Sequence, residues 1–184
     1  MSNTFFISDM HHGHKNILSY EPLRKEKFGD IKNHDLQLIL NWNSVIKPDD
    51  VVWVLGDPFI CGNTYAKEIL SSLLGRKRLV MGNHDLARSQ SQWERMGFEI
   101  ALHAVKIKVD DKLVWLSHYP YRGDSVDDRY NNLKLKDEGD WLFHGHCHSK
   151  GERIRGKQIN VGVDVNNFFP VNEIELIKIM RKTL

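Results

Sequence analysis

The sequence predicts an α/β fold, and three observations carry this prediction. Short apolar runs alternate with helical patterns through the first half of the 184 residues. The second half changes character and contains further short strands, two of them arranged as a hairpin. Apolar runs in both halves end at polar residues that have metal-binding or catalytic chemistry. A strand–helix–strand–helix rhythm is typical of a parallel sheet with crossover helices.

The first half contains three expected strands and the helices that connect them. Leu36, Ile39 and Leu40 recur close to helical spacing, and Pro48 turns the chain before the next strand. In chain order, we expect a strand at Thr4–Ile7, a helix at Asn33–Ile46, a strand at Val51–Leu55, a helix capped by Thr64 with Ala66, Ile69, Leu70, Leu73 and Leu74 on one face, a strand at Arg78–Met81 and a helix near Ser89–Met96.

The second half is predicted to be mainly strands. Ala104–Val109 and Lys112–Leu116 flank Asp110-Asp111 and are expected to form a hairpin. Further strands are expected at Trp141–His144, Gln158–Val161 and Glu173–Met180, the last because its apolar residues alternate. Two polar segments, Lys15–Asn33 and Gly123–Gly139, are long enough to be functional loops or flaps over a site. No repeat or linker divides the chain, so residues 1–184 are expected to form one domain.

Composition limits the classes of protein to consider. A formal net charge of +2 demands neither a nucleic-acid nor a membrane partner. Cys61 and Cys147 provide no framework of paired thiols, which favours a reducing compartment. A strand begins almost at the first methionine, and the apolar runs are too short to cross a bilayer. We therefore expect a cytoplasmic protein; its oligomeric state stays open.

Five short motifs occur in a fixed order, and each follows an expected strand. They are Asp9-Met10-His11, Gly56-Asp57, Gly82-Asn83-His84-Asp85, Ser117-His118 and Gly145-His146-Cys147-His148. In α/β sheets, ligand sites gather beyond the carboxyl ends of the strands. The topology therefore predicts that five separate loops converge at one edge of the sheet.

The motifs offer more ligand groups than one metal ion takes. Asp9 and His11 are separated by one residue, so in an extended chain both side chains point to one side and can share an ion. His146 and His148 have the same spacing. Mixed carboxylate, imidazole and amide ligands suit Mn²⁺, Fe or Zn²⁺. Two ions that share a carboxylate can hold both the attacking and the leaving oxygen in a displacement at phosphorus.

Each motif alone also has a purely structural interpretation. Asp-x-His after a strand is more often a turn with a solvated histidine, and Gly-Asp is a common turn dipeptide. Gly-Asn-His-Asp is equally compatible with a turn that caps the next helix. The conjunction of five motifs, in this order and in the same structural context, favours the metal site.

With these motifs in this order, the chain resembles the calcineurin-like metallophosphoesterases, whose pattern is D-x-H, G-D, G-N-H-[DE], a lone His and G-H-x-H. It is most similar to small bacterial and phage-type members that open with S-D-x-H-x-G-H, here Ser8 to His14. The resemblance implies an α/β sandwich of two mixed β-sheets flanked by helices.

The resemblance also implies a role for each motif residue. One metal ion would be held by Asp9, His11, Asp57 and His148, and the other by Asp57, Asn83, His118 and His146, with Asp57 bridging. A hydroxide between the ions would attack phosphorus in line, and His84 would stabilise the developing charge or protonate the leaving oxygen. The expected cofactors are two divalent ions, Mn²⁺ first, with Fe, Zn²⁺ or Ni²⁺ as alternatives.

Departures from related patterns narrow the substrate. Protein phosphatases of this superfamily follow G-D with an Asp-Arg-Gly element and place an arginine before G-N-H, whereas Pro58 and Met81 stand here. We therefore expect a phosphodiesterase or phosphatase acting on a nucleotide-like or other small phosphoester. The first alternative is a nuclease acting on RNA or DNA ends, served by Arg24, Lys25, Lys27, Arg76, Lys77 and Arg78. The second is a non-catalytic metal-binding scaffold, which the complete motif set disfavours.

Residues outside the metal motifs are candidates for substrate binding. Arg88 and Arg122 follow two of the motifs and could grip a phosphate through a bidentate fork. His14 lies near the Asp9-His11 loop and could contact substrate. Asn160 and Asp164 either border the site or form a strand end and turn.

Overall fold

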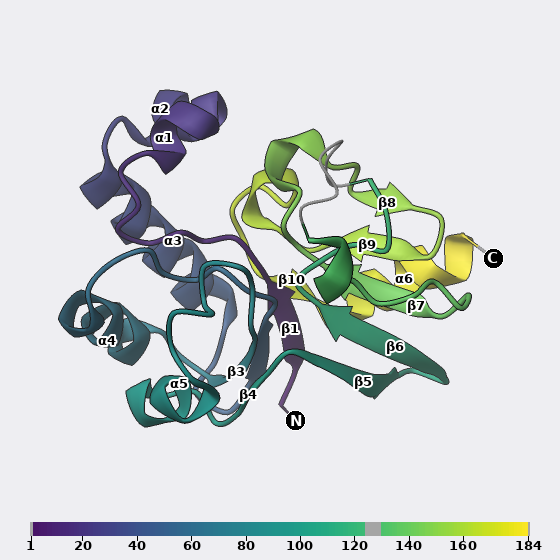
Figure 1. The fold of residues 1–184 in the computed structure, drawn as a ribbon. Coiled ribbons are helices and arrows are strands. Elements are labelled where there is room, and N and C mark those ends of the chain that lie inside the picture. Colours follow the sequence, from purple (N-terminus) through teal and green to yellow (C-terminus); the bar gives the residue numbers. More distant parts are fainter. Residues whose placement is uncertain (1, 124–129, 184) are drawn as a thin grey trace.

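Two mixed β-sheets form the centre of the protein in this computed structural model, which describes residues 2–123 and 130–183. The first sheet contains, in spatial order, β10 (Val171–Asn172), β1 (Thr4–Ile7), β2 (Val51–Val54), β3 (Arg76–Val80) and β4 (Ala101–Leu102). The second contains β5 (Ala104–Val109), β6 (Lys112–Ser117), β7 (Trp141–His144), β9 (Gln158–Asn160) and β8 (Ile154–Arg155). The sheets pack as a sandwich, which confirms the predicted fold class (Figure 1).

Helices flank this sandwich. They are α1 (Ile17–Tyr20), α2 (Pro22–Phe28), α3 (Ile31–Val45), α4 (Asn63–Ser72), α5 (Gln90–Met96) and α6 (Glu173–Lys182), with short 3₁₀ turns η1 (Asn131–Leu133), η2 (His148–Lys150) and η3 (Val163–Val165). Figure 1 shows α3, α4 and α5 on the outer side of the first sheet and α6 beside the second. Of the described helices, none is long and apolar enough to cross a membrane.

Strand direction follows the predicted rhythm. β1, β2, β3 and β4 run parallel through crossover connections, whereas β10 pairs antiparallel with β1. In the second sheet, β5 and β6 form the predicted antiparallel hairpin, and β6, β7 and β9 run parallel. The ends of β1, β2 and β3 therefore lie at one edge, as the sequence predicted.

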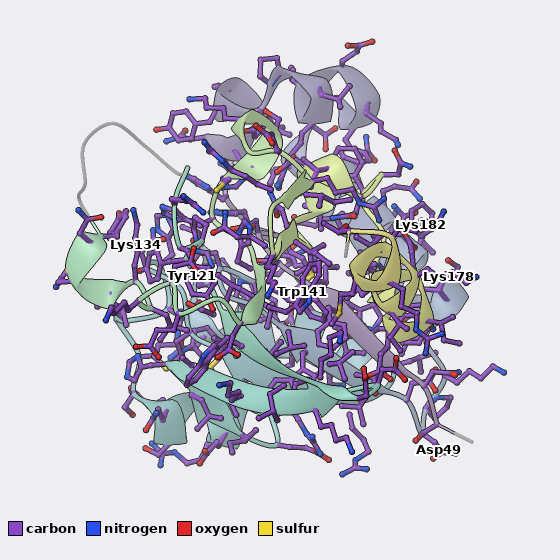
Figure 2. The ribbon with its side chains drawn as sticks, turned by 90° about the vertical axis from the view of Figure 1, so that its right-hand side faces the viewer. Asp49, Tyr121, Lys134, Trp141, Lys178 and Lys182 are labelled. Carbon is purple, nitrogen blue, oxygen red and sulfur yellow. The ribbon has the colours of Figure 1, made fainter. Side chains whose placement is uncertain are left out.

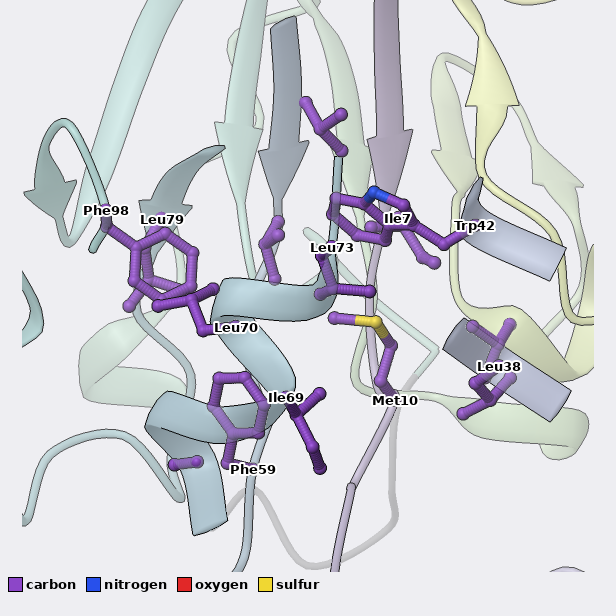
Figure 3. Close-up of a cluster of buried hydrophobic side chains, with 14 of the residues drawn as sticks. Ile7, Met10, Leu38, Trp42, Phe59, Ile69, Leu70, Leu73, Leu79 and Phe98 are labelled. Carbon is purple, nitrogen blue, oxygen red and sulfur yellow. The ribbon is translucent and has the colours of Figure 1, made fainter. Parts of the chain in front are cut away.

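Two apolar clusters result because side chains alternate along each strand of the first sheet. Phe5 and Ile7 of β1 face outward and pack with Trp42 of α3 and with residues of α4 and α5. Figure 3 shows this cluster, with Ile7 and Met10 beside Trp42 and Leu73. Phe6 faces the second sheet, where its ring contacts Phe143 of β7 edge-on at 5.1 Å between centroids. The first sheet is thus covered on both faces.

Helix α3 differs from the predicted stripe. It begins two residues earlier, at Ile31, and its N-cap is Asp30, whose side chain accepts from two backbone N–H groups of the first turn. Leu38 and Trp42 are its buried apolar residues, whereas Leu36 and Leu40 are 54 % and 52 % exposed. The prediction chose the wrong face because the buried face also carries polar residues.

The cap of α4 was also predicted wrongly, whereas the helix predicted near Ser89–Met96 is confirmed as α5, Gln90–Met96. Gly62, and not Thr64, occupies the N-cap of α4, without a side-chain hydrogen bond, and Leu74 lies beyond the helix end. Ser89 caps α5 through a reciprocal capping box with Gln92. The side chains of Ser89 and Gln92 form a recognisable sequence signal for the start of a helix, whereas Gly62 has no side chain that could provide one.

The polar segment Lys15–Asn33 is mostly helical and is not a loop. It forms α1, α2 and the start of α3, and its two buried residues in α2 are Arg24 and Phe28. The sequence does not show that the charged residue Arg24 is buried, so the segment was predicted to be a solvated loop. The second predicted flap, Gly123–Gly139, lies partly outside the described residues; its described part contains η1.

The predicted strand Glu173–Met180 is wrong, because these residues form α6. Leu176 and Met180, one helical turn apart, are its buried residues, and Asn172 caps its first turn. Glu173 starts the helix, and Lys182 in its last turn is favourable for the helix dipole. Figure 2 shows Lys178 and Lys182 on the outer side of this helix. Several isoleucines lie outside the buried stripe of this helix. They make the apolar residues alternate along the sequence, and this alternation led to the wrong prediction of a strand.

Substitutions in α6 test this helix. Leu176 is fully buried, so Leu176→Ala is expected to lower the free energy of unfolding by about 2–5 kcal/mol. Ile174 is 56 % exposed, so Ile174→Ala should change it by less than about 0.5 kcal/mol. Urea denaturation followed by circular dichroism measures both values. In a strand the two side chains would share one face, so equal losses would contradict the helix.

Candidate metal centre

The predicted site residues follow the ends of five strands. Asp9 lies two residues after β1, Asp57 three after β2 and Asn83 three after β3. His118 directly follows β6, and His146 follows β7 by two residues. Both sheets thus send loops to one place, since the carboxyl ends of their parallel strands meet at the same edge of the sandwich.

Five predicted ligands adopt a left-handed backbone conformation. The φ angles are 60° at Asp9, 53° at His11, 53° at Asp57, 70° at His146 and 48° at His148. Each such residue costs on the order of 1–3 kcal/mol unless its surroundings enforce the conformation, and functional sites are where it recurs. The extended chain assumed for Asp9-x-His11 is therefore wrong, although both side chains do reach one ligand group.

Two motif glycines are required because the loops pack closely. A Cβ atom on Gly82 would lie 2.3 Å from Oδ1 of Asp57. A Cβ atom on Gly145 would lie 1.9 Å from Oγ of Ser8 and 2.5 Å from Oδ2 of Asp9. No side chain fits at either position, so these glycines let the carboxylates approach the neighbouring loops.

The first ligand group joins the loops after β1 and β7. Ligand atoms of Asp9, His11 and His148 all lie within 4.8 Å of one another. Oδ2 of Asp9 also accepts a hydrogen bond from the backbone N–H of His146 at 2.9 Å. One carboxylate therefore ties the Gly-His-x-His loop to the Asp-x-His loop.

The second group surrounds His118. Its Nδ1 lies 2.8 Å from the carbonyl oxygen of Leu55, which accepts from it and leaves Nε2 facing the site. That Nε2 is 3.0 Å from Oδ1 of Asn83, 3.2 Å from Nδ1 of His146 and 3.4 Å from Oδ2 of Asp57. The equal spacing of His146 and His148 does not give them one shared ion, because His146 approaches His118 and His148 approaches Asp9.

Asp57 lies between the two groups. Its Oδ2 is 3.8 Å from Nε2 of His11 in the first group and 3.4 Å from Nε2 of His118 in the second. Asp9 also belongs to both groups, because ligand atoms of Asp9, Asp57 and His118 lie within 4.8 Å of one another. This arrangement fits a bridging position for Asp57.

The residues present fit bound cations. Oδ1 of Asp9 and Nε2 of His11 are buried and have no hydrogen-bond partner among the described residues, which is costly for polar atoms. Burial and the charge of Asp9 raise the pKa of Asp57 to about 8. Two adjacent buried carboxylates thus lack compensating charge. A divalent cation supplies that charge and a partner for both unpaired atoms.

Asp85 holds two of the loops together and does not join either ligand group. Its Oδ2 accepts from the backbone N–H of Asp57 at 2.9 Å and of Gly82 at 2.8 Å. Burial and the neighbouring charge of Asp57 raise its pKa to about 7. The backbone carbonyl of Asp85 accepts from the indole of Trp93 at 3.2 Å, which anchors the motif on α5.

His84 is the exposed histidine of the site. Its backbone N–H donates to Oδ1 of Asp57 at 3.0 Å, and its Nε2 lies 3.9 Å from Oδ2 of the same residue. The side chain is 45 % exposed, so it faces solvent at the mouth of the site. Partial burial, with the nearby His14, lowers its pKa.

Two cavities meet at His84. The larger, of about 460 Å³, is lined by His11, His14, Ile17, Tyr20, Glu21, His84, His146, Cys147, His148 and Lys150. The other, of about 410 Å³, is lined by Phe59, Ile60, Cys61, Asn63, His84, Ala87, Arg88 and Gln92. Three predicted ligands, His11, His146 and His148, line the first cavity, and His84 borders both.

The structure brings two of the three predicted substrate-binding residues to these cavities. Nδ1 of His14 lies 3.3 Å from Nδ1 of His11, beside the first ligand group. Arg88 lines the second cavity, where its guanidinium donates to the carbonyl oxygen of Cys61 at 2.8 Å. Arg122 lines neither; its exposed guanidinium lies 3.4 Å from Asp137. A phosphate-gripping role for Arg122 stays a prediction without geometric support.

Sequence reasoning missed part of the site. Glu21 lines the larger cavity, and Arg24 lies behind it, fully buried. Both were assigned to a polar loop, and no motif marks them. Asp164 was left between bordering the site and forming a turn; its Oδ2 lies 2.9 Å from Nδ1 of His148. Burial opposes its ionisation, but hydrogen bonds from Arg24 and His148 lower its pKa to about 2.

Comparison with known proteins agrees with this geometry. Residues 3–163 match the model of the calcineurin-like phosphoesterase superfamily domain. The chain is 37 % identical to the Gene 66 protein of Mycobacterium phage L5, over 89 % of this chain and 87 % of that protein. It is 27 % identical to an uncharacterized protein of Methanocaldococcus jannaschii, over 99 % and 93 % of the two chains.

A solved structure shares the fold across the whole chain. The crystal structure of a protein of unknown function from Aquifex aeolicus superposes with a TM-score of 0.78 at 30 % sequence identity, covering 97 % of this chain and 100 % of that one. The protein described here belongs to the calcineurin-like phosphoesterase superfamily.

Proposed function

We propose that this protein is a metal-dependent phosphodiesterase acting on nucleotide-like or other small phosphodiesters. The observation that carries the proposal is the convergence of two ligand groups, which share Asp9 and are linked by Asp57, at a cavity bordered by His84. The superfamily assignment supports hydrolysis of phosphoesters in general.

Each residue has a defined role in this proposal. Asp9, His11 and His148 would hold one divalent ion, and Asn83, His118 and His146 the other, with Asp57 between them. The bound ions, Mn²⁺ in the first place, supply an acidified water and compensate charge on the phosphoryl oxygens. His84 orients the leaving oxygen and donates a hydrogen bond or a proton to it, because it is the exposed imidazole beside both groups.

The two cavities favour a diester over a monoester. A phosphodiester carries two ester substituents that leave phosphorus in different directions. His84 lines both the cavity with His11 and the cavity with Arg88, so each substituent has a separate place beside it. A monoester would use one of these cavities.

The nuclease alternative loses three of its six basic groups to ion pairs. Arg24 is buried in an ion pair with Asp164. Arg76 and Arg78 pair with Glu99, and they lie on β3, whose opposite, carboxyl end leads to the site. A scaffold role is disfavoured because each predicted ligand is present. The cytoplasmic location stays a prediction; among the described residues, neither Cys61 nor Cys147 forms a disulfide.

Removal of metal is expected to lower thermal stability. An ion at about 100 times its Kd adds about 2.7 kcal/mol to the folded state, and each kcal/mol raises the Tm of a chain this size by about 2–4 °C. Mn²⁺ should therefore raise the Tm by roughly 5–10 °C over protein in chelator, measured by differential scanning fluorimetry. An unchanged Tm in Asp57→Asn and a shift in the wild type would assign the effect to this site. No shift in the wild type would contradict the metal centre.

His84→Ala is expected to lower kcat for bis-p-nitrophenyl phosphate by about 100-fold or more, the usual contribution of a proton donor. Hydrolysis by the wild type should require Mn²⁺, stop in chelator and exceed that of p-nitrophenyl phosphate. The exposed His103, which lines neither cavity, provides the matched control His103→Ala, which should retain wild-type rates. Equal turnover by both variants would show that His84 takes no part in the reaction.

Arg88→Ala is expected to raise KM for the diester by about 10-fold, because hydrogen bonds to a charged group contribute about 1.5–3 kcal/mol. Arg95→Ala removes an exposed arginine from the adjacent α5 and should leave KM unchanged. Steady-state kinetics on both esters measures the effect. A loss of the same size for the monoester would show that the second cavity does not select diesters.

A further inference from the structure

Arg24 is a fully buried arginine whose hydrogen-bonding groups all have partners. Nε donates to Oδ1 of Asp164 at 2.7 Å, and one terminal nitrogen donates to Oδ2 of Asp164 at 2.6 Å. The same nitrogen donates to the carbonyl oxygen of Asp9 at 2.7 Å. The other terminal nitrogen donates to the carbonyl oxygen of Met10 at 3.2 Å and lies 3.2 Å from Nε2 of His34. All five N–H groups are thus used.

Asp164 connects this arginine to a predicted metal ligand. Its Oδ2 lies 2.9 Å from Nδ1 of His148, whereas the nearest nitrogen of Arg24 lies 3.5 Å from the same Nδ1. A carboxylate accepts and a guanidinium donates, so the shorter contact makes Nδ1–H of His148 the donor to Asp164. Nε2 of His148 is then the nitrogen with a free lone pair, available to a metal ion.

We propose that Arg24 and Asp164 form a positioning pair for the metal ion held by Asp9, His11 and His148. Asp164 selects the tautomer and ring orientation of His148, and Arg24 holds both Asp164 and the backbone of the Asp9-Met10 loop. The inference rests on the proposed metal centre and adds two residues from outside its motifs. Neither residue touches the reacting atoms, so both act through the ligands.

The backbone explains why such a pair is needed. Asp9 and His148 both adopt left-handed conformations, with φ of 60° and 48°, which the chain does not hold by local preference. Arg24 donates to the carbonyl oxygen of Asp9 itself, and Asp164 accepts from the side chain of His148. The pair therefore fixes one ligand on each of the two loops and joins these loops through one ion pair.

The Arg24–Asp164 pair acts on one of the two proposed ions. Neither Arg24 nor Asp164 has a hydrogen bond among the described contacts to Asn83, Asp57 or His118, whose group is held by Leu55 and Asp85 instead. Asp164 contacts His148, which does not belong to the Asp9, Asp57 and His118 group, so Asp164→Asn should weaken the ion at Asp9, His11 and His148 and leave the second ion bound. A general loss of fold would weaken both.

Calorimetric titration of the metal-free protein with Mn²⁺ tests this selection. We expect two sites in the wild type and a fall of about 10–100-fold in the affinity of one site in Asp164→Asn, the usual effect of removing a carboxylate behind a ligand histidine. Asp110→Asn is the matched control, because Asp110 pairs with Arg181 at 2.7 Å on the surface. Two wild-type affinities in Asp164→Asn, or equal losses at both sites, would overturn the inference alone. A wild type without Mn²⁺ binding would overturn the proposed function and the inference together.

Nitrogen NMR of the histidine side chains keeps the inference testable if Asp164→Asn fails to fold. In the wild-type protein loaded with diamagnetic Zn²⁺, the proton of His148 is expected on Nδ1, and His148→Gln identifies its signals. A proton on Nε2 would contradict the role of Asp164. In folded Asp164→Asn, the downfield shift of this proton should be lost, whereas Asp110→Asn should retain it.

Discussion

The buried carboxylates of Asp9 and Asp57 impose the constraint on which the site depends. Both lie at the ends of neighbouring parallel strands, and burial together with mutual repulsion raises the pKa of Asp57 to about 8. Such a pair is stable in the folded protein only when backbone N–H groups and cations surround it. The loops after β3 and β7 donate N–H groups to these carboxylates at 3.0 Å and 2.9 Å.

Because of these contacts, the packing of the loops and the arrangement of the ligands depend on each other. Gly82 and Gly145 let the neighbouring loops come within hydrogen-bonding distance, and the loops in turn enforce left-handed backbone at the ligands. Strain of this kind persists only where several contacts determine the same conformation. Asp85 and Arg24 provide such contacts; the carbonyl of Asp85 is bonded to Trp93 of α5, and Arg24 lies in α2.

Superfamily membership and the geometry of the site support different conclusions about this protein. The family model establishes membership of the calcineurin-like phosphoesterase superfamily, and the solved structure from Aquifex aeolicus shares the fold. The choice of a diester substrate rests instead on two cavities that meet at His84. We therefore expect substrate specificity to depend on loops and helices at the sandwich edge, because function resides in the site and not in the fold.

Part of this protein was determined by the sequence alone. Apolar runs such as Val51–Leu55 predict buried strands, and the ligand residues follow those strands in the chain, so these strands and the edge that carries the site were predictable. Side-chain capping at Ser89 was predictable for the same reason, because the signal lies within four residues.

Only the tertiary structure decided the remainder. Arg24 and Asp164 are 140 residues apart, so no local pattern connects them. The sequence also does not distinguish a buried arginine from a solvated one, and Arg24 was therefore predicted to lie on a polar loop. The strand predicted at Glu173–Met180 became α6 because Leu176 and Met180 meet the second cluster together. Burial depends on which surfaces meet, and local patterns do not contain that information.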